Sequence, residues 1–221
     1  MKSVKILEEN NDYIVCIKPS GVSSEDTKTE GMPSLLANGD NKPFVVHRLD
    51  KEVSGVMVFA KSSRMAAELT RQITEKTFKK EYLAVVSGEV EEHGIFEDLL
   101  YHDRIKNKTY TVKRERKGVK SAKLEFWRLG VSETENGVVS LVRVKLFTGR
   151  THQIRVQFAS RQHPILGDRK YGSETNCQVA LFSYLLGFNN KGEEKILKAF
   201  PQNIFPWNCF SNFEKIQRKN S

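Results

Sequence analysis

Three short stretches of the sequence place titratable residues beside an apolar segment that could hold them. The first is VHRLD at residues 46–50, which stands shortly before the apolar run at 53–60. An Asp beside an Arg is most often a solvated ion pair. Polar residues crowded at the entrance to a buried strand are also where rigid scaffolds present catalytic side chains, so Asp50 is the first candidate.

The second stretch is KKEY at residues 79–82, in which a tyrosine stands at the start of an apolar segment. Tyrosines are common in hydrophobic cores, so Tyr82 taken alone favours a structural interpretation. It becomes a functional candidate only in combination with the other two stretches.

The third stretch, TGRTHQIR at residues 148–155, carries the strongest local signal for anion binding. Gly149 permits a tight turn from strand to helix. Arg150 and Thr151 would then stand at a helix N-terminus, where free backbone N–H groups and the helix dipole favour anions. Arg155 lies one helical turn further on and could face the same ligand. The alternative is an apolar helix with incidental basic residues.

The positive charge of the chain is concentrated in two segments. The net charge is +9, from 36 Lys and Arg against 27 Asp and Glu. Residues 101–123 hold nine basic residues against two acids, and residues 145–170 hold six against one, which leaves the remainder acidic. Scattered surface lysines would explain the total, but two concentrated patches favour a polyanionic partner, most often nucleic acid.

Patterns of apolar residues indicate the elements that must position these stretches. A helix over 64–76 follows from Met65, Leu69 and Ile73 at four-residue spacing after the N-cap candidates Ser62 and Ser63. A second helix would start from Thr151 as its cap. Strands are predicted over residues 13–17, 53–60, 82–86, 140–147 and 179–188, with a basic hairpin over 101–123 that turns near Lys117-Gly118. Strands outnumber helices, which predicts an α+β fold with a mostly antiparallel or mixed sheet.

Composition excludes several classes of protein. The chain of 221 residues is long enough for one large domain or two small ones sharing an interface. Three cysteines without a CxxC pair fit neither a secreted disulfide framework nor a zinc ribbon. No signal-type core is found at the N-terminus, and no apolar run approaches ~18 residues, so we expect a soluble intracellular protein without a membrane partner.

Four motifs together resemble the RluA-type RNA pseudouridine synthases, over roughly residues 12–188. Their order along the chain is that of the family, which makes coincidence implausible. They are the opening element KPSGV at 18–22, the catalytic signature HRLDKEVSGVMVFAK at 47–61, the tyrosine-bearing strand KKEYLAVVSG at 79–88, and the C-terminal signature TGRTHQIRVQFA with HPILGDRKYG at 163–172.

This resemblance implies a single pseudouridine synthase catalytic domain over residues 1–221, with 101–123 as a basic insertion and no separate N-terminal RNA-binding domain. The implied activity is isomerisation of uridine in tRNA or rRNA. Asp50 matches the essential aspartate, which could attack ribose, add to the uracil ring or remove a ribose proton. Tyr82 matches the tyrosine that stacks on the base and is a candidate general base. Arg150 matches the cation that keeps the aspartate ionised.

The target base must leave its stack before reaction, and Arg48 is expected to fill the gap it leaves. His47 and Arg155 are expected to contact phosphate or to orient other groups. Further RNA contacts are expected from Arg114, Arg116 and Lys117. No redox or hydrolytic step is implied, so neither a cofactor nor a metal is expected. We expect a cytoplasmic monomer whose partner is RNA.

Two other classes remain as alternatives. A metal-dependent phosphohydrolase could use His47, Asp50, His152 and His163, although the sequence has neither a His-Asp doublet nor an HxH pair. A non-catalytic RNA-binding protein of the same fold would explain the basic patches. It would not explain a carboxylate beside Arg48 in a site that faces RNA.

Overall fold

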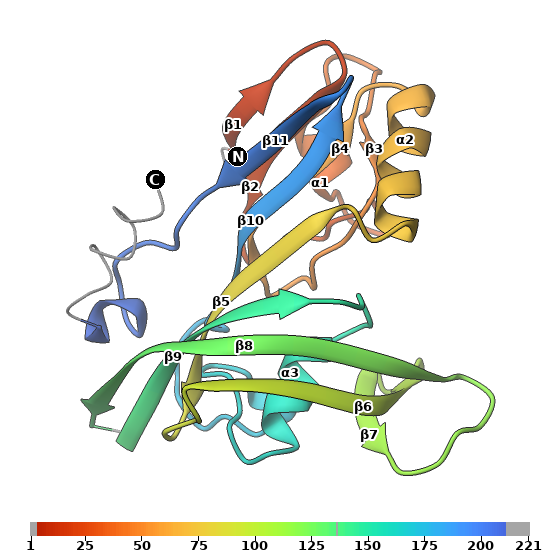
Figure 1. Ribbon diagram of the computed structural model, residues 1–221. Helices are drawn as coiled ribbons and strands as arrows, with labels where there is room; N and C mark the ends of the chain where they lie inside the picture. The colour runs from red at the N-terminus through yellow and green to blue at the C-terminus, as the bar shows by residue number, and fades with distance from the viewer. Residues whose placement is uncertain (1–3, 136, 211–221) are drawn as a thin grey trace. The chain divides into compact units, whose positions relative to one another are not determined.

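The computed structural model describes residues 4–135 and 137–210 and divides the chain into two compact units. The first unit comprises Met1–Lys80 and Phe182–Pro201, and the second comprises Glu81–Leu181 and Gln202–Ser221. Each unit is built on β-strands with few helices, as Figure 1 shows. The predicted α+β fold class is therefore confirmed. No helix of the described residues is long and apolar enough to span a membrane.

The sheet of the first unit has the strand order β1-β2-β4-β10, with β11 on β10 and β3 on β4. All of its pairs are antiparallel except β4 with β10. Its elements are β1 (Lys5–Glu9), β2 (Tyr13–Lys18), α1 (Met32–Leu35), β3 (Phe44–Val45), β4 (Ser54–Ala60), α2 (Ser63–Thr74), β10 (Leu181–Asn190) and β11 (Glu193–Lys198). The strands predicted at 13–17, 53–60 and 179–188 are confirmed.

Helix α2 begins as its sequence predicts. The hydroxyl of Ser62 accepts a hydrogen bond from the Met65 backbone N–H at 3.2 Å, which caps the first turn. Met65 and Leu69 are buried against β2 and β4 in the main core of this unit. The remaining members of that core are Tyr13, Val15, Val56, Val58, Ala60, Phe78, Leu186 and Phe188.

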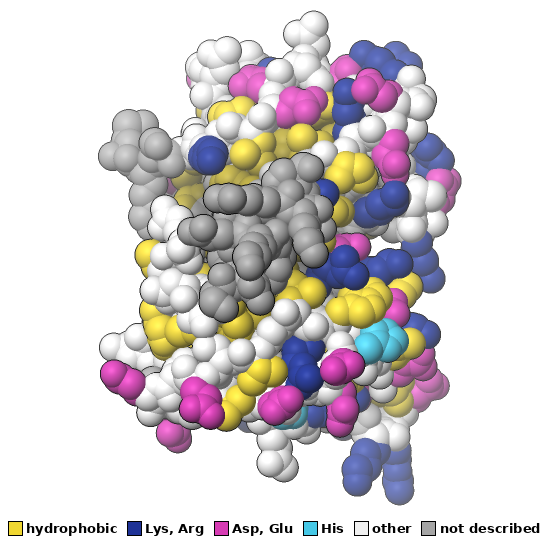
Figure 2. Space-filling view, turned by 60° about the vertical axis from the view of Figure 1, so that its left-hand side comes forward, with side chains coloured by type: hydrophobic (Ala, Val, Ile, Leu, Met, Phe, Trp, Pro, Cys, Tyr) yellow, Lys and Arg dark blue, Asp and Glu magenta, His cyan; other side chains and the backbone are white. Residues whose placement is uncertain are grey.

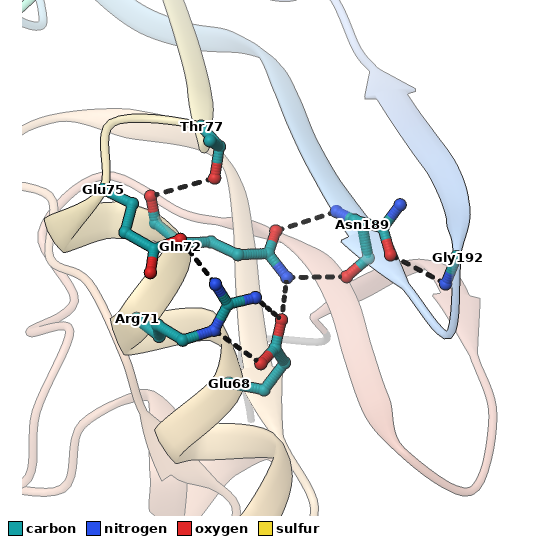
Figure 3. A network of polar contacts seen from close by, with 7 residues as sticks. All are labelled: Glu68, Arg71, Gln72, Glu75, Thr77, Asn189 and Gly192. Carbon is teal, nitrogen blue, oxygen red and sulfur yellow. Dashed lines mark hydrogen bonds and ion pairs between the residues drawn. The ribbon is translucent and has the colours of Figure 1, made fainter.

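A buried carboxamide attaches α2 to β10 (Figure 3). Gln72, 2% exposed, donates through Nε2 to the Asn189 carbonyl at 2.8 Å and accepts from the Asn189 N–H at 2.8 Å. The side chain thus satisfies both polar groups of one strand residue, as a neighbouring strand would. The same Nε2 also donates to Glu68, which Arg71 holds from one turn further along the helix.

The second unit holds an antiparallel sheet in the order β5-β9-β8-β6-β7. Phe158 of α3 packs on one face of it, with ring centroids 5.1 Å from Phe96 and 5.3 Å from Phe126. Its elements are β5 (Lys79–Ser87), β6 (His93–Asp103), β7 (Lys108–Val112), β8 (Val119–Thr134), β9 (Gly137–Leu146), α3 (Gln153–Ala159) and the 3-10 helices Arg169–Tyr171 and Trp207–Cys209.

The expected N-cap of α3 is wrong. The helix starts at Gln153, and its cap is His152, in the left-handed conformation with φ 55° and without a side-chain hydrogen bond. Thr151 precedes the cap, and its carbonyl accepts a hydrogen bond from the Thr109 hydroxyl at 2.8 Å. Arg150 and Thr151 therefore precede the helix rather than start it, and the Gln153 N–H donates to the Arg150 carbonyl at 3.1 Å.

The basic segment 101–123 contains a hairpin and the start of a third strand. The chain first turns at residues 104–107, where Asp103 Oδ1 accepts from the N–H groups of Ile105 and Lys106. Strands β7 and β8 then pair with opposite edges of β6, joined by the loop at 113–118. The Lys117-Gly118 pair lies in this second connection, so the β6–β7 turn comes earlier in the chain than expected.

Candidate active site

Asp50 lies in the loop between β3 and β4 of the first unit. Its neighbour Leu49 is 7% exposed and Val53 is 2% exposed, so buried side chains anchor the loop on both sides of the carboxylate. The Asp50 carbonyl accepts from the Val53 N–H at 3.0 Å, which closes a tight turn leading into β4. Asp50 itself is half-buried. Buried neighbours therefore hold this short polar loop in place, and the catalytic role of Asp50 stays a prediction.

The KPSGV segment holds the same loop from the other side. The ammonium of Lys18 is fully buried and donates to three backbone carbonyls, those of Pro19 (3.0 Å), Val22 (2.7 Å) and Lys51 (3.1 Å). The Gly21 N–H donates to the same Lys51 carbonyl at 2.8 Å, and glycine suits this position because φ is 81°. The motif therefore fixes the chain directly after Asp50.

His47 lies in the core rather than at a surface that RNA could reach. It is 7% exposed, and its ring is 5.6 Å from that of Phe78. Nε2 accepts a hydrogen bond from the Val58 N–H at 3.2 Å. Val58 lies on β4, next to Phe59, which pairs with Val45 at the end of β3. The proton of the neutral ring must therefore be on Nδ1. Burial, with a smaller contribution from the charge of Lys80, holds the pKa of His47 well below 6.5. This burial favours the orienting role over the phosphate contact among the two roles expected for His47, and that role stays a prediction.

Arg48 is exposed and points to solvent from the same loop. Its Nη1 forms an ion pair with Glu25 at 2.9 Å, and both side chains are well exposed. Exposed pairs of this kind stabilise by only about 0–1 kcal/mol, so RNA could displace Glu25 at little cost. The role of Arg48 in base flipping remains a prediction.

Tyr82 and Arg150 belong to the second unit. Tyr82 is 7% exposed on β5, directly opposite Val144 of β9. Arg150 follows β9, and its Nε donates to the Ser121 carbonyl of β8 at 2.9 Å. Its backbone N–H donates to the Gln153 carboxamide at 3.0 Å. The two terminal nitrogens of Arg150 have no partner in the part of the chain that the structure describes, so they are available to an anion.

Arg155 is buried in the second unit, at 2% exposure. Its Nε and Nη2 donate to the two carboxylate oxygens of Asp168, at 2.6 and 2.8 Å. Its guanidinium also lies over the ring of Tyr171, 5.2 Å from the centroid. This burial contradicts a direct contact of Arg155 with the RNA backbone and leaves the orienting role that was expected as its alternative.

The three basic residues expected to bind RNA all lie in the exposed loop between β7 and β8. Arg114, Arg116 and Lys117 are exposed, and the Arg116 guanidinium lies 4.9 Å from the ring centroid of Tyr101. The face drawn in Figure 2 carries both basic and acidic side chains, with several Lys and Arg side chains side by side toward its right-hand edge. The charge of the loop remains the clearest local signal for a polyanion, and its role stays a prediction.

Lys80 is a candidate site residue that the sequence patterns did not indicate. It stands on β5, two residues before Tyr82 in the sequence, and is the last residue of the first segment of the first unit. Its ammonium lies 5.1 Å from the centroid of the Phe78 ring. Burial lowers the pKa of Lys80 to about 8.

The second unit also carries a surface pocket of about 420 Å³. Its lining combines Lys123 with the carboxylates of Glu97 and Asp98, and Lys123 pairs with Glu97. The other lining residues are Leu99, Ser121, Ala122 and Thr148. This mixed charge does not favour a phosphate group over other polar ligands.

The residues considered for a metal-dependent phosphohydrolase do not assemble into a ligand set. In residues 4–135 and 137–210, no group of three or more His, Cys, Asp or Glu side chains is placed to hold a metal ion. His47 in addition uses Nε2 to accept from Val58, so that nitrogen is occupied. The geometry of the donors thus disfavours this alternative.

Comparison with known proteins identifies the family. The family model described as RNA pseudouridylate synthase matches residues 12–160. An uncharacterized RNA pseudouridine synthase of Aquifex aeolicus is 36% identical over 217 residues, covering 86% of this chain and 67% of the relative. The chain therefore belongs to the RNA pseudouridylate synthase family, a class of RNA-modifying isomerases.

Two further relatives carry more specific names. The uncharacterized RNA pseudouridine synthase YhcT of Bacillus subtilis is 37% identical over 76% of this chain and 57% of its own length. Ribosomal large subunit pseudouridine synthase D of Borreliella burgdorferi is 32% identical over 98% of this chain and 71% of its own length. The chain thus spans between 57% and 71% of the three relatives named here.

Solved structures support the same fold. Human RNA Pseudouridylate Synthase Domain Containing 1 matches with a TM-score of 0.80 at 21% identity, over 99% of this chain and 95% of that chain. Human RNA Pseudouridylate Synthase Domain Containing 4 matches with a TM-score of 0.72 at 24% identity, over 90% and 89%. At these identities the likeness concerns the fold alone.

Proposed function

We propose that this protein isomerises uridine in structured RNA to pseudouridine, with Asp50 as the catalytic carboxylate. The observation that carries the proposal is the family match over residues 12–160, which spans Asp50, Tyr82 and Arg150. The anchoring of the Asp50 loop by buried neighbours and by Lys18 supports it independently.

The reaction breaks the N-glycosidic bond and rejoins the uracil to ribose through carbon, so substrate and product have the same atoms. Asp50 would start it by attacking ribose or base, or by removing a ribose proton. Tyr82 would stack on the base and accept the proton that leaves its ring carbon. Arg150 would supply the positive charge that favours an ionised carboxylate. No electron transfer or hydrolysis is required, so we expect neither a cofactor nor a metal.

Access to the base would require flipping of the target nucleotide, which costs a few kcal/mol. Exposed Arg48 would occupy the vacated space, and the basic loop with Arg114, Arg116 and Lys117 would bind backbone phosphate. Large-subunit rRNA is the first substrate to test, because the Borreliella relative is named for it. Transfer RNA is the second. We propose a cytoplasmic monomer.

Release of tritium from RNA labelled at uracil carbon 5 tests this function, using large-subunit rRNA and tRNA transcripts. Wild-type protein should release tritium, and Asp50→Asn should not, because an amide is a much poorer nucleophile and base. Binding of RNA by Asp50→Asn should be equal or slightly tighter, since the change removes a negative charge. Wild-type protein that binds RNA without tritium release from either RNA would instead favour a non-catalytic RNA-binding protein. An active Asp50→Asn, with deamidation excluded by mass, would contradict the role of Asp50.

A further inference from the structure

Ser24, two residues after the KPSGV motif, contacts the chain immediately before Asp50. The side chain of Ser24 is 4% exposed, so it lies within the first unit rather than at its surface. Its hydroxyl donates to the Leu49 carbonyl at 2.8 Å, and the Leu49 N–H donates back to the hydroxyl oxygen at 3.0 Å. One side chain thereby satisfies both backbone polar groups of the residue that precedes Asp50.

These two bonds restrict the backbone of the catalytic loop. Leu49 is 7% exposed, so its N–H and C=O have little access to water and need a partner within the protein. With both groups held by Ser24, the peptide planes on either side of Leu49 cannot rotate freely. The direction of the Asp50 Cα–Cβ bond depends on one of those planes.

The surroundings of Ser24 make it a rigid support. Its hydroxyl also lies 3.6 Å from the sulfur of Met57, a fully buried residue of β4. Ser24 is therefore held between the loop and a central strand of the sheet. On the other side of Asp50, the loop depends on different bonds, from Lys18 and Gly21 to the Lys51 carbonyl.

We propose that Ser24 is a positioning residue for Asp50, acting through the backbone of Leu49. This inference rests on the proposed function of Asp50. The bonds to Lys51 keep the loop attached when the Ser24 hydroxyl is removed, so the fold survives. What is lost is the fixed direction of the carboxylate, on which the rate of the chemical step depends.

The test compares Ser24→Ala with Ser24→Thr, which retains a hydroxyl at the same carbon. Ser140→Ala is the matched control, because the buried Ser140 hydroxyl of β9 likewise donates to a backbone carbonyl, that of Gly88 at 2.8 Å, and accepts from a backbone N–H, that of Val90 at 3.2 Å. Each variant is assayed for single-turnover tritium release, for RNA affinity and for thermal unfolding. We expect Ser24→Ala to react at least tenfold more slowly with RNA affinity within threefold of wild type. Ser140→Ala should stay within threefold of wild type in both the rate and the RNA affinity.

Rescue separates positioning from a general loss of structure. Ser24→Thr should recover most of the rate that Ser24→Ala loses. If Ser24→Ala does not unfold cooperatively, Ser24→Cys replaces Ser24→Ala in the comparison, because its thiol is a weaker hydrogen-bonding group than the hydroxyl. The proposal is overturned if the hydroxyl-deficient variant reacts within threefold of wild type, or if RNA affinity falls as much as the rate does. Lack of tritium release by wild-type protein would instead overturn the proposed function.

Discussion

Arg155 and Asp168 form a two-point ion pair in the core of the second unit, with both side chains at most 2% exposed. Removing one partner of a buried pair leaves an uncompensated charge. We expect Asp168→Asn to lower the free energy of unfolding by about 3–5 kcal/mol. Urea unfolding followed by circular dichroism measures this. The control is Glu97→Gln, which breaks the exposed pair with Lys123 and should cost no more than about 1 kcal/mol. Equal losses in the two variants would contradict a stabilising role for the buried pair.

Tyr82→Phe tests whether the hydroxyl moves a proton. The ring remains in place opposite Val144, so RNA binding and the fold should persist. If the hydroxyl accepts the proton from the base, single-turnover tritium release should fall by ~10²-fold or more. Tyr184→Phe, which removes the hydroxyl of a buried tyrosine on β10, serves as the control. A rate near that of wild type in Tyr82→Phe would leave Tyr82 with the stacking role alone.

Replacing Arg114, Arg116 and Lys117 by Ala tests the basic loop. The triple variant should bind RNA more weakly, and the slope of log K against log salt should flatten by up to ~0.7 for each single-strand phosphate that the loop no longer neutralises. The control removes the same charge from the first unit by replacing Lys191, Lys195 and Lys198, and its slope should match that of wild type. An unchanged slope in the loop variant would mean that the loop does not contact RNA.

Lys80 should make stability depend on pH in a defined window. Its folded-state pKa of about 8 lies below the unfolded value of 10.5, so the unfolded protein binds the extra proton between these two values. The contribution of Lys80 to the free energy of unfolding therefore rises, in favour of the folded state, between pH 8 and pH 10.5. Lys80→Met loses this dependence and should be more stable than wild type at pH 7, by up to about 3 kcal/mol, with the difference vanishing near pH 10.5.

Urea unfolding at several pH values between 7 and 10.5 measures this effect. Lys79→Met is the control, because Lys79 is exposed and pairs with Glu194. A pH dependence that is the same in Lys80→Met and wild type would show that the ammonium of Lys80 is well solvated in the folded protein.

Local sequence patterns predicted the elements whose side chains are mostly buried. The apolar runs that form β2 and β4 are buried on both faces, so their apolar composition alone was sufficient to predict them as strands. The short strands β1 (KILEE) and β11 (EEKILK) were not predicted, because they carry mostly charged residues. Both lie at the edge of the sheet, where charged side chains are favoured.

The surroundings of His47 and Thr151 have a long-range origin. His47 was expected to contact phosphate or to orient other groups, and because β3 ends at Val45 its imidazole instead satisfies the Val58 N–H. Thr151 was expected to cap α3, but the cap is the left-handed His152, whose ring is hydrogen-bonded to the Tyr171 hydroxyl. Neither partner is visible in a local pattern, since each is brought close only by the folded sheet.

The neutral imidazole of His47 has a consequence for enzyme kinetics. Burial holds its pKa well below 6.5, and Nε2 accepts a hydrogen bond from the Val58 N–H, which favours the neutral ring. An inflection of the pH–rate profile near 6.5, the ordinary pKa of histidine, is therefore expected to report another ionising group, even though a histidine stands three residues from Asp50. Kinetic pKa values measured near 6.5 should therefore be assigned first to groups other than His47, whose Nε2 serves as a hydrogen-bond acceptor.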